Sequence, residues 1–241
     1  MNHLPQSDGI VDTAFTRMLT KLAAQEPDWP VFNQGYEQVL QGIQDGGTFP
    51  FHGMTLTAPP GIYPPKHNSS TDFVVSHWDA AGMRAAPGSL LEVGTGSGGL
   101  SLYAIKNGWR VRACDIDPLA VHAAEKNAVA NGMHLDVMVS DLFAGFKGQR
   151  FDAILFNFPL YHKETADWHE RALSDANGQL TKRFFDEAKD HLNEDGFVVF
   201  MYSNCSRGDL LEREDWDFQI VGADFDLIGR YWRALVRARP R

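Results

Sequence analysis

The sequence predicts an α/β fold with one doubly wound, mostly parallel sheet of seven strands, an antiparallel C-terminal hairpin and an N-terminal helical cap. From residue 89 onward, short apolar runs alternate with helical stretches, which is typical of parallel strands joined by crossover helices. Several of these runs end on glycine, aspartate or asparagine, the residue types found where ligands bind at the carboxyl edge of such a sheet. The chain has 241 residues, 44% of them hydrophobic, which is enough for a sizeable core.

The N-terminal part has a different pattern. Residues 12–45 have helical apolar spacing, which we expect Pro30 to interrupt, and residues 47–72 predict a short hairpin followed by a stiff, proline-rich loop. We expect residues 1–72 to form a cap and loop that cover the site, and residues 73–241 to form the ligand-binding domain.

The strands and helices of the second part follow from apolar runs and their periodicity. Helices are clearest over 119–131 and 179–192. Strands are expected over 89–93, 111–115, 135–139, 153–157 and 197–203, and the terminal hairpin over 218–224 and 231–237.

Charge and composition limit the partners. Lys and Arg number 22 against 31 Asp and Glu, a net charge of −9, which argues against binding to a phosphate backbone and favours a small-molecule or protein partner over nucleic acid. The basic tail is interpreted as the solvated edge of a strand: Arg230, Arg233, Arg237, Arg239 and Arg241. With two cysteines, no leader pattern and no long apolar run, we expect a cytoplasmic protein without disulfides or a membrane span.

A glycine-rich turn begins the candidate site. The stretch 91–99, Leu-Glu-Val-Gly-Thr-Gly-Ser-Gly-Gly, leaves a predicted strand and opens a helix. Glycines suit such a turn because the backbone bends sharply and a ligand approaches with no Cβ in the way. Gly94, Gly96 and Gly99 also fit G-x-G-x-x-G, so the turn alone does not separate a nicotinamide cofactor from S-adenosylmethionine.

Polar residues at the ends of the next strands extend the site. Asp115 lies 21 residues after Gly94, where a carboxylate can accept both ribose hydroxyls of an adenosine. Asp117 precedes Pro118 and is expected to cap the next helix. Asp141 ends the third strand, within reach of an adenine amino group, and Asn157 ends the fourth.

Together these motifs resemble those of the class I, Rossmann-like S-adenosylmethionine-dependent methyltransferases, from about residue 63 to the end. Asn157 with Pro159, and Tyr63-Pro64-Pro65 with the segment 69–72, are similar to the amine-modifying branch that includes release-factor glutamine and adenine-N6 methyltransferases. The resemblance implies that Glu92 and the glycine turn hold the amino-acid portion of the cofactor, Asp115 the ribose and Asp141 the adenine. The implied cofactor-binding set is Tyr63, Glu92, Gly94, Gly96, Gly98, Asp115, Ile116, Asp141, Leu142 and Asn157, with no metal.

The fourth strand departs from the family pattern Asn-Pro-Pro-Tyr, because residues 157–161 read Asn-Phe-Pro-Leu-Tyr. An asparagine oxygen and a nearby carbonyl can accept hydrogen bonds from an amine and align its lone pair with the carbon bonded to sulfur. An aromatic face could add cation–π attraction to the sulfonium. The candidate catalytic residues are Asn157, Phe158, Pro159 and Tyr161, and the candidates for the aromatic face also include Tyr63, Trp29 and Phe32. The last two fit equally well as residues that pin the N-terminal helices.

A polar cluster follows, containing His162, Glu164, His169 and Glu170, but its spacing matches no metal site. We interpret it as an exposed loop that shapes substrate access, in which His162 could assist proton loss from an amine.

Two reactions remain open on the residues. One is methylation of a nitrogen on a small-molecule or protein acceptor. The alternative is that of an azetidine-2-carboxylate synthase, in which S-adenosylmethionine is cyclised by its own α-amine and methylthioadenosine is released. A non-catalytic adenosine-binding regulator is disfavoured, because a pure binder has no need of Asn157.

Overall fold

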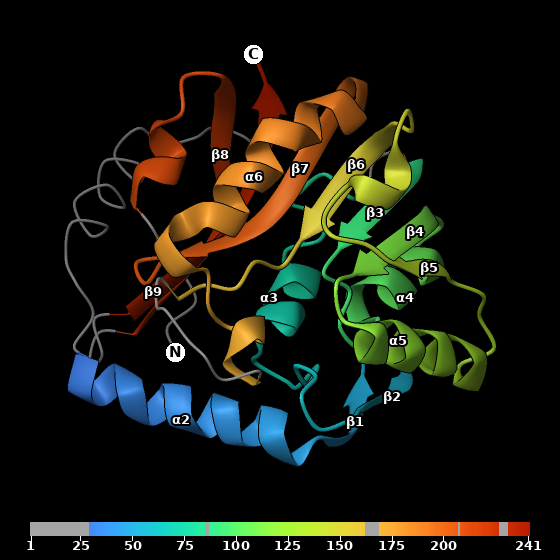
Figure 1. Cartoon of the computed structure of the whole chain (residues 1–241), viewed down its shortest axis with the longest axis vertical. Helices are drawn as coiled ribbons and strands as arrows, with labels where there is room; N and C mark the ends of the chain where they lie inside the picture. The colour runs from blue at the N-terminus through green and yellow to red at the C-terminus, as the bar shows by residue number, and fades with distance from the viewer. Residues whose placement is uncertain (1–28, 85–86, 162–168, 207, 227–230) are drawn as a thin grey trace.

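The computed structural model describes residues 29–84, 87–161, 169–206, 208–226 and 231–241. Seven strands form one sheet in the order β5-β4-β3-β6-β7-β9-β8 (Figure 1). The first five in this order pair in parallel and the last two join antiparallel, which confirms the predicted fold class. Their bounds are β3 Ser89–Val93, β4 Arg110–Asp115, β5 Asp136–Val139, β6 Phe151–Phe156, β7 Leu192–Ser203, β8 Trp216–Asp226 and β9 Tyr231–Pro240.

Helices cover both faces of the sheet. α3 (Ser70–Ser76), α4 (Gly99–Lys106) and α5 (Pro118–Ala130) pack on one face, and α6 (Gln179–Ala188) packs on the other. Side chains of a strand alternate between the two faces, so Leu90 of β3 joins the first core and Leu91 the second. Asp117 caps α5 by accepting a hydrogen bond from the Leu119 amide at 2.8 Å, as its place before a proline predicts.

Some predicted boundaries were wrong. The helix expected over 179–192 ends at Ala188, where the 3-10 turn η4 (Lys189–His191) takes over and leads directly into β7. Four further 3-10 turns are η1 Ala144–Phe146, η2 His169–Ala172, η3 Ala176–Gly178 and η5 Gly208–Glu212.

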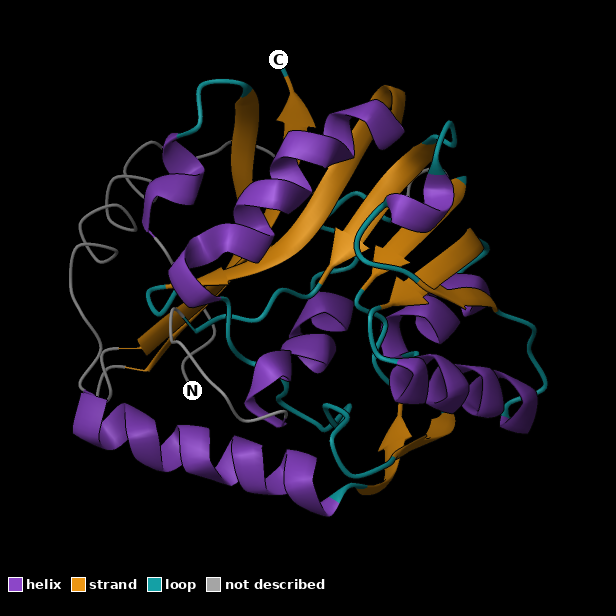
Figure 2. Cartoon of the chain, in the orientation of Figure 1, coloured by secondary structure: helices purple, strands orange, loops and turns teal. Residues whose placement is uncertain are grey.

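The N-terminal elements lie beside the main sheet. α2 (Trp29–Asp45) precedes a hairpin of β1 (Gly47–Phe51) and β2 (Met54–Ala58), which forms a separate two-stranded sheet (Figure 2). Pro30 does not interrupt this helix. It occupies the first turn, where its missing N–H breaks no helical hydrogen bond. The part of the predicted helical region before Trp29 lies outside the described residues.

The arginine tail is not a solvated edge, because β9 lies between β7 and β8 inside the sheet. Arg233 pairs with Asp224 at 3.0 Å, and both side chains are only about a tenth exposed, at 11% and 12%. The Arg237 guanidinium lies 4.0 Å from the centre of the Phe197 ring. Arg239 and Arg241 are exposed as expected, and Arg230 lies outside the described residues. Within the described ranges, the helices are too short or too polar to cross a bilayer.

Candidate functional site

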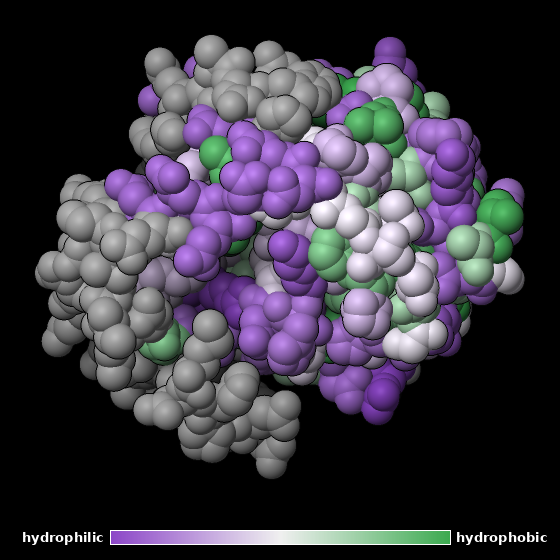
Figure 3. Space-filling view, turned by 90° about the horizontal axis from the view of Figure 1, so that it is seen from below, coloured by the Kyte–Doolittle hydropathy of each residue, from purple (hydrophilic) through white to green (hydrophobic). Residues whose placement is uncertain are grey.

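A cavity of about 920 Å³ opens at the carboxyl ends of β3, β4 and β6. Its volume lies in the usual range for small-molecule sites, and its position is where ligands bind in open α/β sheets. α2, the loop before α3, and the ends of β8 and β9 complete the wall. Seen from the side of α2, the described surface around a central hollow is largely hydrophilic (Figure 3).

The glycine turn presents bare backbone to this cavity. Gly94 has a φ of +67°, and a Cβ there would lie 2.7 Å from the Phe156 ring. Gly96 has a φ of +55°, and its nearest neighbour to a Cβ is Ile62 at 3.9 Å, so the added atom would occupy free space. Gly98 instead faces α5, where a Cβ would lie 3.1 Å from the Ala124 Cβ. Thus Gly94 and Gly96 line the cavity and Gly98 serves helix packing.

Glu92 is almost fully buried at the cavity wall, with 2% of its surface exposed. Its carboxylate accepts hydrogen bonds from Thr95 Oγ1 at 2.8 Å and from Ser101 Oγ. Burial raises the pKa of Glu92 to about 7, and the two hydroxyl donors limit the rise. A ligand ammonium beside this carboxylate would favour the ionised form.

Asp115 is held by backbone amides at the end of β4. Its Oδ2 accepts from the Gly96 amide at 2.9 Å and its Oδ1 from the Asp117 amide at 3.0 Å. Burial raises the pKa of Asp115, while the amide donors oppose the rise. Each oxygen keeps a further acceptor position, so the carboxylate can take a vicinal diol. Ile116 follows on the cavity wall and leaves 67% of its surface exposed, an apolar surface that a flat base could cover.

Asp141 and Leu142 do not line this cavity. Asp141 forms an ion pair with Arg183 of α6 at 3.0 Å, and its side chain is about half exposed. Leu142 is buried with a φ of +46°. The structure therefore does not bring these two residues together with Glu92 and Asp115. The adenine role of Asp141 and the place of Leu142 in the cofactor-binding set stay predictions.

Asn157 directly follows β6 and lines the cavity. Its Nδ2 donates to Ser70 Oγ at 2.9 Å. Its Oδ1 is buried and has no hydrogen-bond partner among the described residues. A buried acceptor left without a donor costs about 1–3 kcal/mol, which a ligand N–H could recover.

The other residues of the 157–161 stretch are divided between core and cavity. The Phe158 ring packs against Phe184 and Phe200 at centroid distances of 5.0 and 5.5 Å, so most of it belongs to the core although it touches the cavity. Pro159 also lines the wall. Tyr161 meets Tyr36 of α2 edge-on at 4.9 Å, and burial raises the pKa of its phenol well above the usual value.

Tyr63 lines the cavity and accepts a hydrogen bond from Ser70 at 3.3 Å. The side chains of Trp29 and Phe32 lie outside the described residues, as do His162, Glu164 and the side chain of His169. In the part that is described, no three His, Cys, Asp or Glu side chains gather as a metal site.

Sequence reasoning missed several wall residues. Tyr36 comes from α2, and the terminal hairpin contributes Asp224, Phe225, Tyr231 and Arg233. No local motif marks these residues. The antiparallel return of β9 beside β7 brings the hairpin residues to the cavity, and α2 contributes Tyr36 from a distant part of the sequence.

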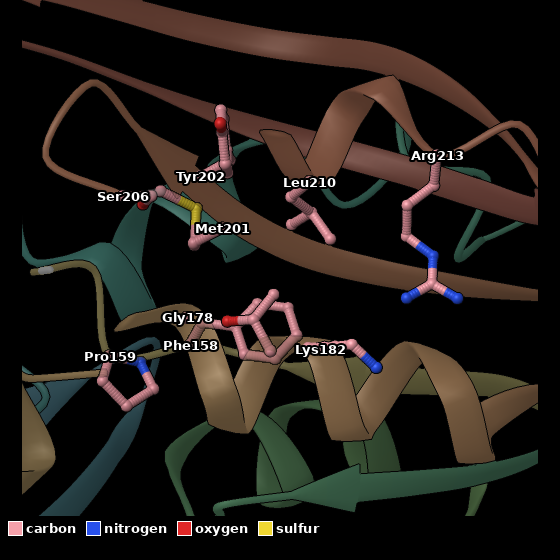
Figure 4. A pocket seen from close by; sticks show the side chains of 10 residues that line it. Phe158, Pro159, Gly178, Lys182, Met201, Tyr202, Ser206, Leu210 and Arg213 are labelled. Atoms are coloured by element: carbon pink, nitrogen blue, oxygen red, sulfur yellow. The ribbon is translucent and has the colours of Figure 1, made fainter. Parts of the chain in front are cut away.

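A second cavity of about 240 Å³ lies between α6 and the segment 201–213 (Figure 4). It shares Phe158 and Pro159 with the main cavity. Its two cationic side chains, Lys182 and Arg213, both pair with Asp186, at 2.7 and 2.8 Å. This smaller cavity therefore offers no uncompensated charge from these residues to a ligand.

The sequence is similar to methyltransferases. A sequence model described as methyltransferase small domain matches residues 53–214. A ribosomal RNA small subunit methyltransferase C of Alcanivorax borkumensis is 29% identical over 118 residues, covering 49% of this chain and 33% of the relative. A release factor glutamine methyltransferase of Streptococcus pneumoniae is 29% identical over 123 residues, covering 46% of this chain and 44% of the relative.

A solved structure agrees in fold. The 16S rRNA N2 methyltransferase of T. thermophilus, in complex with AdoMet and guanosine, matches with a TM-score of 0.63 and 19% identity, covering 81% of this chain and 50% of that one. The chain thus spans half or less of the length of these three proteins. Two of the three are named for ribosomal RNA, so the comparisons do not support excluding nucleic acid as a partner.

Proposed function

Because the chain belongs to the methyltransferase small domain family, we propose that it transfers the methyl group of S-adenosylmethionine to a nitrogen of a small-molecule or protein acceptor. The observation that carries this proposal is the buried Oδ1 of Asn157, which has no donor among the described residues although Asn157 lines the cavity. An amine N–H is the donor that such an oxygen would take.

The residues of the cavity fit the cofactor. Gly96 leaves space that a Cβ would fill, Asp115 keeps acceptor positions for a ribose diol, and Glu92 supplies a carboxylate for the α-ammonium. By resemblance to the family, Asp141 is proposed to bind the adenine and Leu142 to belong to the cofactor-binding set. Bound S-adenosylmethionine would supply an electrophilic methyl carbon on its sulfonium.

The contribution of the chain to the reaction is orientation. Asn157 Oδ1 would accept one N–H of the acceptor amine and direct its lone pair toward the methyl carbon, which converts a random encounter into an aligned one. The backbone at Pro159 has a fixed φ, so a carbonyl of the 157–159 stretch can act as a second, rigid acceptor. As the nitrogen–carbon bond forms, the carbon–sulfur bond would break and its electron pair would stay on sulfur; the methylated ammonium would then release one proton to solvent water.

A second candidate reaction is cyclisation of S-adenosylmethionine to azetidine-2-carboxylate. The tyrosines at the cavity wall support it, because Tyr36 and Tyr161 form an edge-on pair and Tyr63 and Tyr231 lie on the same wall. Aromatic faces could hold the sulfonium while the methionine chain folds back for ring closure. The relatives above are named for methyl transfer, so they favour the first candidate.

Incubation with S-adenosylmethionine, with and without acceptors, tests both candidates. The acceptors are a small primary amine, a glutamine-containing peptide and a ribosomal RNA fragment, with products identified by mass spectrometry. Methyl transfer predicts S-adenosylhomocysteine and a methylated nitrogen only when the amine or the peptide is present. Enzyme-dependent methylthioadenosine and azetidine-2-carboxylate from the cofactor alone would refute methyl transfer, and a product on RNA alone would overturn the proposed acceptor class.

A further inference from the structure

Ser70 connects the loop before α3 to the proposed reaction centre. Its hydroxyl oxygen accepts a hydrogen bond from Asn157 Nδ2 at 2.9 Å, across 87 positions of sequence. The same hydroxyl donates to the Tyr63 hydroxyl oxygen at 3.3 Å. All three side chains line the main cavity. Ser70 therefore lies between a residue of the cavity loop and the asparagine on which the proposed function rests.

The direction of these bonds determines which end of the Asn157 carboxamide faces Ser70. A carboxamide has one accepting and one donating end of nearly equal size, so shape alone does not select its orientation. The one proton of Ser70 is used on Tyr63, which leaves the Ser70 oxygen to act as an acceptor toward Asn157. Only Nδ2 can satisfy an acceptor, and Oδ1 is consequently the end left for the substrate.

The position of Ser70 is fixed without help from Asn157. At the start of α3, Ser69 Oγ accepts from the Asp72 amide at 3.2 Å. The buried Asp72 carboxylate accepts from the Asn68 amide at 2.8 Å and contacts His52 Nε2 at 2.7 Å, which ties the loop to the β1–β2 connection. Ser70 thus presents its hydroxyl from an anchored segment.

We propose that Ser70 is a positioning residue that, through its hydrogen bonds to Asn157 and Tyr63, orients the Asn157 carboxamide so that Oδ1 accepts the N–H of the substrate amine. This inference rests on the proposed role of Asn157. Without the Ser70 hydroxyl, Nδ2 loses its buried partner and the carboxamide can turn over, which would set a donor against the amine.

Two cofactor analogues make the orientation measurable without a known acceptor. Sinefungin has an amine in place of the S-methyl group, whereas S-adenosylhomocysteine has neither, so the ratio of their dissociation constants reports the hydrogen bond to Asn157 Oδ1. Calorimetry with S70A should show sinefungin binding weakened by about tenfold, the worth of one hydrogen bond to a charged group. Binding of S-adenosylhomocysteine should stay within about twofold. S70T, which keeps the hydroxyl, should restore the wild-type ratio.

Matched variants separate the possible failures. S76A removes a hydroxyl of the same helix that, among the described residues, donates to the Asp72 carbonyl and hydrogen-bonds neither Asn157 nor Tyr63, and it should leave the ratio unchanged. Y63F removes the hydroxyl to which Ser70 donates, so the Ser70 proton could donate to Oδ1 of a turned carboxamide. The ratio should therefore shift in the same direction as in S70A, and Y63F provides the test if S70A does not fold. If N157A raises the ratio of the sinefungin to the S-adenosylhomocysteine dissociation constant while S70A leaves it unchanged, the role of Ser70 alone is overturned. An unchanged ratio in N157A would overturn the proposed role of Asn157 itself.

Discussion

Replacing Asp115 by alanine tests the cofactor assignment. The carboxylate already accepts one backbone amide on each oxygen, from Gly96 and Asp117, so each oxygen can take one further donor from a ribose diol. Loss of a hydrogen bond to a charged acceptor is worth about 1.5–3 kcal/mol. The expected result for D115A is therefore S-adenosylmethionine and S-adenosylhomocysteine binding about 10- to 150-fold weaker.

Isothermal calorimetry measures this directly, with D136A as the control. Asp136 of β5 pairs with Arg112 of the neighbouring β4, is exposed and does not line the cavity. D115N, which keeps one accepting oxygen, should fall between the wild type and D115A. Thermal melts show whether the variants remain folded, since D115A also leaves the Gly96 and Asp117 amides without their partner. Unchanged affinity in a folded D115A would refute the placement of the ribose at this carboxylate.

Three further variants test other parts of the structure. Glu92 has its folded pKa raised to about 7 from 4.5, so its contribution to stability is fully present below about pH 4.5 and is lost as pH rises through 7. E92Q should therefore flatten the fall in melting temperature between pH 5 and pH 8 in the ligand-free protein, and an unaltered slope would contradict this. G96A should lower the free energy of unfolding by about 1–2 kcal/mol, because the φ of Gly96 is +55°. It should also weaken S-adenosylhomocysteine binding, because the added methyl group enters the cavity; equal affinity by calorimetry would contradict a close approach of the ligand to Gly96. N127A should lower the free energy of unfolding in urea by about 2–4 kcal/mol, since the buried Asn127 carboxamide hydrogen-bonds the Thr57 amide, the Thr57 carbonyl and the Ser97 carbonyl. A loss below about 0.5 kcal/mol would show that these hydrogen bonds contribute little to stability.

The sequence predicted the parallel sheet because buried strands and crossover helices have distinct local periodicities. The Asp117 cap could also be predicted from local sequence, since an aspartate directly before Pro118 commonly caps the N-terminus of a helix. The error at Pro30 came from reading a proline as a helix breaker without knowing that it falls in the first turn. The edge assignment of the arginines failed because strand order is a tertiary property that no strand pattern contains.

For the site, spacing within one βαβ unit predicted the glycine turn and Asp115, which the structure places together on the cavity wall. The roles of these residues, the division of the chain at residue 72 and the cytoplasmic location stay predictions. Asp141 follows β5 by two residues, but it pairs with Arg183 of α6, which is far away in the sequence, and no local pattern indicates this contact. Ser70 and the hairpin residues Asp224 and Arg233 come to the cavity through long-range packing.

The role of Asn157 is tested most directly by measuring turnover and cofactor binding in N157A. If Asn157 orients an amine, turnover of S-adenosylmethionine with the acceptor that the product screen identifies should fall about a hundredfold or more, because alignment is felt mainly in the transition state. The dissociation constant of S-adenosylmethionine should change by less than about threefold, which is under 1 kcal/mol. Equal losses in rate and in cofactor affinity, in a variant with an unchanged melting temperature, would contradict the account by showing that Asn157 only supports the cofactor.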